Sequence, residues 1–136
     1  MAAATDQPRV GVAVLIRRGN TLLLSRRPNP PEQNSWQCAG GYLRPGESVL
    51  DCAQRCVVAT GVQINQLSAG PYTNNRFEPS GLHSISLYVL AESNTAEANT
   101  GWQWHDWQQL PQPLFLPLNL LTDQYSNWLR QAMTRV

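Results

Sequence analysis

The segment from Gly40 to Gly61 has the composition and spacing of a glycine-rich loop that leads into a helix. This layout is suited to presenting phosphates held by metal ions, and a magnesium or manganese ion would need carboxylate oxygens on that helix. The expected helix carries a single carboxylate, Asp51, which is poorly placed for such a site. The segment therefore indicates a phosphate-binding scaffold that has lost its metal chemistry.

Three cysteines, Cys38, Cys52 and Cys56, are the other residues whose chemistry needs an explanation. Their odd number and spacing do not fit a disulfide framework and are typical of reduced cysteines. Cys52 and Cys56 lie four residues apart on the expected helix and could form half of a zinc site. The two histidines, His83 and His105, are isolated in the chain, so we favour small buried core residues.

The composition describes a globular protein and excludes several function classes. A length of 136 residues, with 42% apolar residues, is enough for one domain with a real core. All ten basic residues are arginine, which excludes chemistry that depends on lysine, and the net charge of +1 argues against nucleic-acid binding. No apolar run reaches the length of a membrane span, and no signal peptide is recognised. We expect a cytoplasmic protein with a flexible leader at residues 1–8 and a single domain over residues 9–136.

Hydrophobic periodicity predicts the strands that position the Gly40–Gly61 segment. Residues 9–18 and 21–27 are β-rich runs separated by Gly19-Asn20, which is typical of a hairpin. Further strands are expected at residues 36–39, 62–67, 70–77, 82–91 and 102–104.

Two helices complete the predicted fold. Ser48, followed three residues later by Asp51, is expected to cap the first helix, and Gly61 is expected to end it. An apolar stripe over residues 118–132 predicts one amphipathic closing helix. The order of elements predicts an α/β fold, a mixed β-sheet sandwiched between helices.

The residues from Trp36 to Gly41, followed by Gly46-Glu47, resemble the entry to a Nudix box. In the full box, G-x5-E-x7-R-E-U-x-E-E-x-G-U, U is a bulky aliphatic residue, and Gly41, Glu47 and Arg55 match its first three fixed positions. Residues 22–27 and 102–111 resemble flanking strands of nucleotide-cleansing members. The resemblance implies the Nudix fold and a hydrolase of nucleotide diphosphate bonds, with one to three divalent metals held by glutamates of the box.

The chain departs from this pattern at the metal-binding positions. Counting from Gly41 places Cys56, Ala59 and Thr60 where the family has its carboxylates. Counting back from Gly61 places Arg55, Val58 and Ala59 there, so neither register contains an acid. We therefore expect no metal cofactor, unless ligands have been relocated to hold magnesium or manganese.

Two parts of the box remain candidates for function. Glu47 is either a surviving metal ligand or, as we favour, the partner of Arg55 in an ion pair that braces the loop. Gly40 and Gly41 either let the backbone approach a phosphate or serve a bulge and a tight turn.

Candidates outside the box include Arg26 and Arg27, which end the second strand, where substrates lie in similar proteins. Because side chains alternate along a strand, only one of the two can face a pocket. Asn119 matches a base-reading asparagine of some relatives or begins the last helix. Glu78 is a candidate general base, but solvated loop charge is the favoured interpretation. A polar and aromatic cluster could line a pocket; its members are Tyr72, Asn74, Arg76, Phe77 and Glu78.

These observations leave three hypotheses open. The first is a non-catalytic module that binds a nucleotide or another phosphate-bearing small molecule, or a protein partner. The second is an active pyrophosphohydrolase that uses magnesium or manganese, with Glu47, Glu78 and Asp106 as relocated ligands. The third is a structural subunit that uses its helix surface. We expect no nucleic-acid or membrane partner.

Overall fold

The computed structural model describes residues 7–135, so most of the predicted leader lies outside the described residues. A mixed sheet of seven strands, in which β3, β2, β1, β6 and β5 follow one another, forms the centre, as predicted. The strands are β1 (Arg9–Arg18), β2 (Thr21–Arg26), β3 (Trp36–Gln37), β4 (Ala39–Tyr42), β5 (Asn65–Arg76), β6 (His83–Glu92) and β7 (Trp102–Asp106). The helices are α1 (Val49–Val57), the 3₁₀ turn η2 (Val58–Thr60), α2 (Leu116–Gln124) and α3 (Ser126–Thr134).

Strand β1 organises the sheet. It runs parallel to β6 along one edge, from the pair Arg9–Ser84 to the pair Arg17–Glu92. Its other edge is shared, because β4 pairs antiparallel with the first half of β1 and β2 pairs with its end. The predicted hairpin is present, with Gly19 in a left-handed conformation. This arrangement brings β4, and with it Gly40 and Gly41, to the centre of the sheet.

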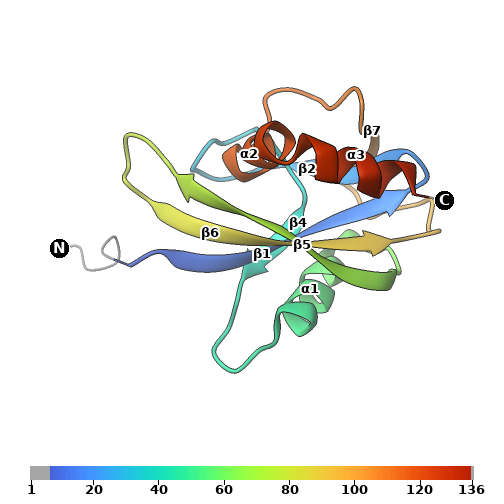
Figure 1. Ribbon diagram of the computed structural model, residues 1–136, viewed down its shortest axis with the longest axis horizontal. Helices are drawn as coiled ribbons and strands as arrows, with labels where there is room; N and C mark the ends of the chain where they lie inside the picture. Colours follow the sequence, from blue (N-terminus) through green and yellow to red (C-terminus); the bar gives the residue numbers. More distant parts are fainter. Residues whose placement is uncertain (1–6, 136) are drawn as a thin grey trace.

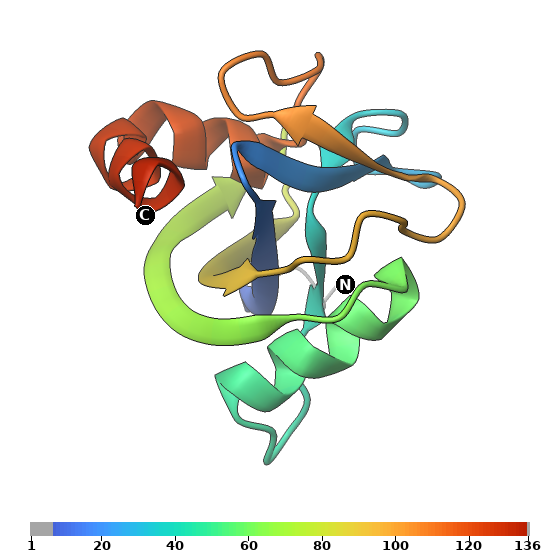
Figure 2. The same cartoon turned by 90° about the vertical axis from the view of Figure 1, so that its right-hand side faces the viewer.

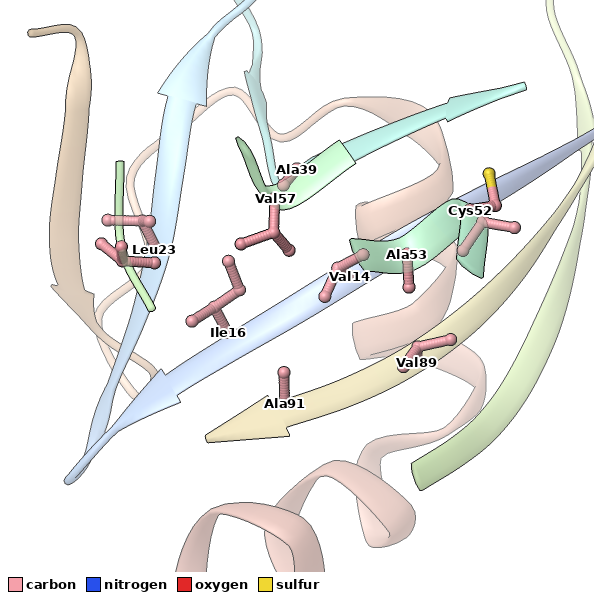
Figure 3. Close-up of a cluster of buried hydrophobic side chains, with 11 residues drawn as sticks. Val14, Ile16, Leu23, Ala39, Cys52, Ala53, Val57, Val89 and Ala91 are labelled. Atoms are coloured by element: carbon pink, nitrogen blue, oxygen red, sulfur yellow. The ribbon is translucent and has the colours of Figure 1, made fainter. Parts of the chain in front are cut away.

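Helices cover both faces of the sheet, with α1 on one side and α2 and α3 on the other (Figure 1). Alternating residues of β1 supply the two cores, since neighbouring side chains of a strand point to opposite faces. Val14 and Ile16 pack toward Ala53 and Val57 of α1 (Figure 3), whereas Leu15 belongs to the core under α2 and α3. The sheet therefore presents one face to the box helix and the other to the C-terminal helices.

Strand β5 replaces two predicted strands and carries the sheet around its edge. Figure 2 shows this strand as a strongly curved ribbon between the α1 side and the α2–α3 side. The pairing with β6 shifts register between Asn65 and Leu67 and again between Ala69 and Tyr72. Such bulges bend a strand without ending it, which is why residues 65–76 form one element. Residues 62–64, expected in the first of the two strands, precede β5.

Two further predictions about the elements were wrong. The closing helix is broken at Tyr125, which has φ −126° and ψ 38°, so α2 and α3 are separate helices. The apolar stripe continues across the break because Leu118 and Leu129 both pack into the same core. The Gly40–Gly41 pair lies within strand β4 rather than in a loop. None of the described helices has the length and apolarity needed to cross a membrane.

Candidate functional site

Helix α1 begins as the sequence predicts and ends in a tighter turn. The Ser48 hydroxyl accepts a hydrogen bond from the backbone N–H of Asp51 at 3.0 Å, which caps the first turn. The α-helix stops at Val57, η2 continues to Thr60, and Gly61 closes the turn with φ 77°. A 3₁₀ turn advances by ~120° per residue instead of ~100°, so the last residues face other directions than a continued α-helix would give them.

Glu47 and Arg55 form an ion pair that ties the loop after β4 to α1. The Arg55 Nε donates to Glu47 Oε2 at 2.7 Å, and Nη2 donates to Oε1 at 3.0 Å. The backbone N–H of Arg44 donates to the same carboxylate, and Arg55 Nη2 also donates to the Tyr42 carbonyl oxygen. These hydrogen bonds, the Arg55 bond first, lower the pKa of Glu47 to about 2. The Glu47 carboxylate therefore already accepts hydrogen bonds from Arg55 of α1 and from the backbone of its own loop.

The three positions that correspond to carboxylates in the box hold no hard ligands. Cys56 packs beside the core, where its Sγ would lie 3.1 Å from a Cβ placed on Gly41. Ala59 is exposed and offers no side-chain donor atom. Thr60 is fully buried, and its hydroxyl donates to the Val57 carbonyl oxygen at 2.6 Å. The 3₁₀ turn thus directs the one oxygen-bearing side chain into the protein.

A magnesium or manganese ion does not fit this helix. These ions require several oxygen ligands, and a cysteine sulfur and a methyl group supply none. The part of the chain that the structure describes contains no group of three His, Cys, Asp or Glu side chains that could hold a metal. Of the proposed relocated ligands, Glu47 is paired with Arg55, Glu78 is exposed after β5, and Asp106 accepts a hydrogen bond from the Gln108 backbone.

The cysteines follow the favoured interpretation rather than the zinc half-site. Cys52 is fully buried in the core between α1 and the sheet (Figure 3), and Cys56 packs against that core. Burial raises the pKa of Cys38 to about 12 and that of Cys52 to about 11. Thiols with such pKa values stay protonated at neutral pH and are poor metal ligands.

A pocket of about 200 Å³ lies on the other face of the sheet, between the strands and the start of α2. Its lining comes mainly from β1, β4 and β6 and from the segment that enters α2. The polar and aromatic members are Arg27, Gln37, Tyr42, Phe77, Ser84, Ser86, Tyr88 and Phe115. Arg27 is the single charged residue in the lining, and no carboxylate faces the pocket.

Arg27 is the member of the arginine pair that lines the pocket. Its Nε donates to the Pro31 carbonyl oxygen at 2.8 Å and its Nη1 to Gln37 Oε1 at 2.8 Å. Its guanidinium carbon lies 4.0 Å from the centre of the Phe115 ring. Desolvation by burial lowers the pKa of Arg27, although an arginine remains charged. Arg26, in contrast, is exposed and lies outside the pocket lining.

The two glycines of β4 line the same pocket. Gly40 pairs with Ala13 and Gly41 with Val12, and neither glycine has a positive φ, so no tight turn requires them. A Cβ placed on Gly40 would lie 2.6 Å from the carbonyl oxygen of Val12, a distance that real Cβ atoms avoid. The close approach of β4 to β1 therefore explains Gly40.

The remaining sequence candidates lie elsewhere. Asn119 is exposed in the first turn of α2 and lines a different, open hollow that includes Trp107 and Leu129. Helix α2 begins before Asn119, at Leu116. Glu78 lies outside the pocket lining, although its neighbour Phe77 belongs to it.

Sequence reasoning missed the lining residues on β6 and the residue before α2. Ser84, Ser86 and Tyr88 lie on one face of β6, and Phe115 stacks on Phe77 with ring centres 5.5 Å apart. The sequence does show these polar residues at every second position, Ser84, Ser86 and Tyr88, which places them on one face of a strand. The apolar residues that alternate with them dominate the hydrophobic pattern, so this polar face was not recognised.

Comparison with known structures shows the same fold. A MutT NUDIX hydrolase from Burkholderia pseudomallei is 24% identical, with a TM-score of 0.76 over 88% of this chain and 98% of the other. The NUDIX domain of Shewanella oneidensis NrtR, solved with ADP ribose, is 17% identical, with a TM-score of 0.74 over 90% of each chain. The C. elegans Ap4A hydrolase is 19% identical, with a TM-score of 0.68 over 90% of this chain and 99% of the other.

A comparison against protein families leads to the same family that the box segment indicates. The family model described as the NUDIX domain matches residues 7–129, which include the box loop, α1 and every strand. The chain belongs to the Nudix family.

Proposed function

We propose that this protein binds a nucleotide or a similar phosphate-bearing small molecule without a metal ion, and that metal-dependent hydrolysis is lost or strongly impaired. The proposal rests on two features of this protein, one in the box helix and one in the pocket on the sheet. The box helix has Cys56, Ala59 and Thr60 in place of its carboxylates, whereas a pocket on the sheet retains an arginine and no opposing acid.

The helix argues against hydrolysis. Hydrolysis of a diphosphate in this family depends on metals that neutralise developing charge and activate water. Loss of a single oxyanion-hole donor costs an enzyme ~2.7–4 kcal/mol of activation free energy, so the absence of three metal-binding carboxylates should leave little of the rate. Glu47 does not compensate, because its carboxylate already accepts bonds from Arg55 and from the Arg44 backbone.

The pocket supports anion binding through Arg27. A guanidinium has five N–H donors, and three of those of Arg27 are used by Pro31, Gln37 and Pro30. The remaining two donors are free to bind phosphate oxygens, and the existing bonds hold the group in place. No ion pair between Arg27 and a carboxylate is found among residues 7–135. The nearest acidic influence is that of Glu32, whose carboxylate accepts a hydrogen bond from the Leu116 backbone N–H.

The solved relatives favour a nucleotide as the ligand class. One was crystallised with ADP ribose, and another is named as an Ap4A hydrolase. Both names describe nucleotides in which phosphates join two organic groups. We transfer only the general class of ligand, since identities below 25% show the fold alone.

A thermal-shift panel tests the proposal. The protein is heated with nucleoside monophosphates, nucleoside triphosphates and ADP-ribose, each in EDTA and in millimolar Mg²⁺ or Mn²⁺. Ligands that bind the native state raise the unfolding temperature by mass action, so we expect at least one shift of equal size in both conditions. Turnover of a panel member with metal would contradict the proposal and favour an enzyme with relocated ligands. The absence of any shift would contradict ligand binding.

A further inference from the structure

One wall of the pocket is built from buried polar side chains of β5 and β6. Their side chains are between 0% and 9% exposed. In the paired strands, Thr73 lies opposite Ser86 and Asn75 opposite Ser84. We call Thr73, Asn75, Ser84, Ser86 and Tyr88 the polar wall; its two serines and its tyrosine line the pocket directly.

The polar wall is only partly satisfied by its own hydrogen bonds. Asn75 Nδ2 donates to Ser84 Oγ at 3.1 Å and to Ser86 Oγ at 2.9 Å, which holds both hydroxyls in place. Thr73 Oγ1, Asn75 Oδ1 and the Tyr88 hydroxyl make no hydrogen bond of good geometry, and they are three of the four such buried side-chain atoms within residues 7–135. The Thr73 side chain nevertheless lies near enough to Tyr88 to act on its pKa, in the direction opposite to that of burial. Turning the Asn75 amide over would exchange its two atoms and still leave one without a partner.

Such a cluster lowers the free energy of unfolding compared with an apolar core of the same volume. Buried polar groups without partners destabilise the folded state, and apolar side chains of similar size would pack at lower cost. Their concentration beside one pocket indicates that a bound molecule, or water in its absence, supplies the missing partners. The wall therefore has the properties of a recognition surface.

The wall is neutral and faces a pocket with aromatic sides. It contains no acidic or basic residue, and burial raises the pKa of Tyr88 above its ordinary value, so its phenol stays protonated. Hydroxyl groups rotate and serve as donors or acceptors, which suits ring carbonyls, ring nitrogens and amino groups. Phe77 and Phe115 line the same pocket and stack on each other, so they give the pocket an apolar side.

We propose that the polar wall determines ligand specificity by binding the neutral hydrogen-bonding edge of a heteroaromatic ring through Ser84, Ser86 and Tyr88. Asn75 is a positioning residue, because it acts through the two serines. The inference rests on the proposed function, in which Arg27 binds the anionic group of the same ligand. The ligand is therefore a molecule with a polar ring at one end and a phosphate at the other.

Isothermal titration calorimetry with nucleoside 5′-monophosphates in EDTA tests the assignment. Tyr88→Phe removes the Tyr88 hydroxyl without changing the shape of the ring, and Ser86→Ala removes the Ser86 hydroxyl, which accepts a hydrogen bond from Asn75. Tyr72→Phe is the matched control, because Tyr72 is exposed and its side chain points to the other face of β5. We expect affinity to fall about tenfold in Tyr88→Phe and in Ser86→Ala and to be unchanged in the control.

A second readout separates recognition from a structural role. In the free protein the Tyr88 hydroxyl makes no hydrogen bond of good geometry, so Tyr88→Phe should unfold at the same temperature as the wild type or higher. Unchanged affinity in both variants would overturn the assignment while leaving the proposed function intact. A joint loss of affinity and thermal stability in Tyr88→Phe would also overturn it. If the wild type binds no nucleotide of the thermal-shift panel, the proposed function fails and the assignment fails with it.

Discussion

Replacing Arg27 by glutamine tests whether this side chain binds the anionic part of the ligand. The substitution removes the single charge of the pocket lining and keeps a polar side chain. Two of the five N–H donors of Arg27 are free, so a phosphate can receive one or two charge-assisted hydrogen bonds. Each hydrogen bond to a charged group contributes about 1.5–3 kcal/mol, so we expect binding to weaken about ten- to hundredfold.

The variant Arg26→Gln is the matched control for this experiment. It makes the same change in net charge at the adjacent residue, but Arg26 is exposed and lies outside the pocket. Arg27 also bonds to Pro31 and Gln37, so its replacement will lower the thermal stability, and affinity must be measured well below the unfolding temperature of each variant.

Calorimetry with nucleoside 5′-monophosphates in EDTA, at two salt concentrations, gives the result. Wild-type affinity should fall as salt rises, whereas the affinity of Arg27→Gln should depend less on salt because a charge pair has been lost. Equal affinity in Arg27→Gln and the wild type would refute the reasoning. An equal loss in Arg26→Gln would also refute it, since the effect would then come from overall charge.

Two further predictions concern the box loop and strand β4. The folded-state pKa of Glu47, about 2, lies below its ordinary value of 4.5, so its contribution to stability is complete above pH 4.5 and is lost as the pH falls toward 2. Glu47→Gln should therefore unfold at a lower temperature than the wild type at pH 7, with a difference that shrinks in this acid range; a pH-independent difference would exclude the ion pair as its cause. Gly40→Ala should destabilise the protein by about 1–3 kcal/mol in urea denaturation, because its Cβ would meet the Val12 carbonyl oxygen at 2.6 Å. Gly11→Ala, whose nearest contact would be 3.5 Å, is the control, and an equal loss there would contradict the steric explanation.

The fold could be predicted from local signals that agree with one another. Gly19-Asn20 marks the hairpin, and Ser48 caps α1 as expected. The bend of β5 and the break at Tyr125 could not be predicted, because both leave the hydrophobic pattern intact. A bulge adds residues to a strand without removing its apolar face, and two short helices can share one apolar stripe.

The site was only partly predictable for a similar reason. The non-acidic residues at positions 56, 59 and 60 are visible in the sequence, since Cys56, Ala59 and Thr60 are read directly from the box spacing. The polar wall cannot be recognised in the sequence, because its residues come from two strands and only the pairing register of these strands brings Asn75 beside Ser84. Polar residues that alternate along a strand usually indicate a solvent-facing side, and burial by α2 reverses that expectation here.

The measurement that tests the central claim most directly is a calorimetric titration of Mn²⁺ into the protein, alone and with the nucleotide that gives the largest thermal shift. Because the box helix offers no carboxylate at its three metal positions, we predict no saturable heat at millimolar Mn²⁺ beyond that of Mn²⁺ binding to the nucleotide alone, and no release of phosphate. The nucleotide should bind with the same affinity in EDTA and in Mn²⁺. Stoichiometric Mn²⁺ binding accompanied by cleavage of the nucleotide would contradict the account.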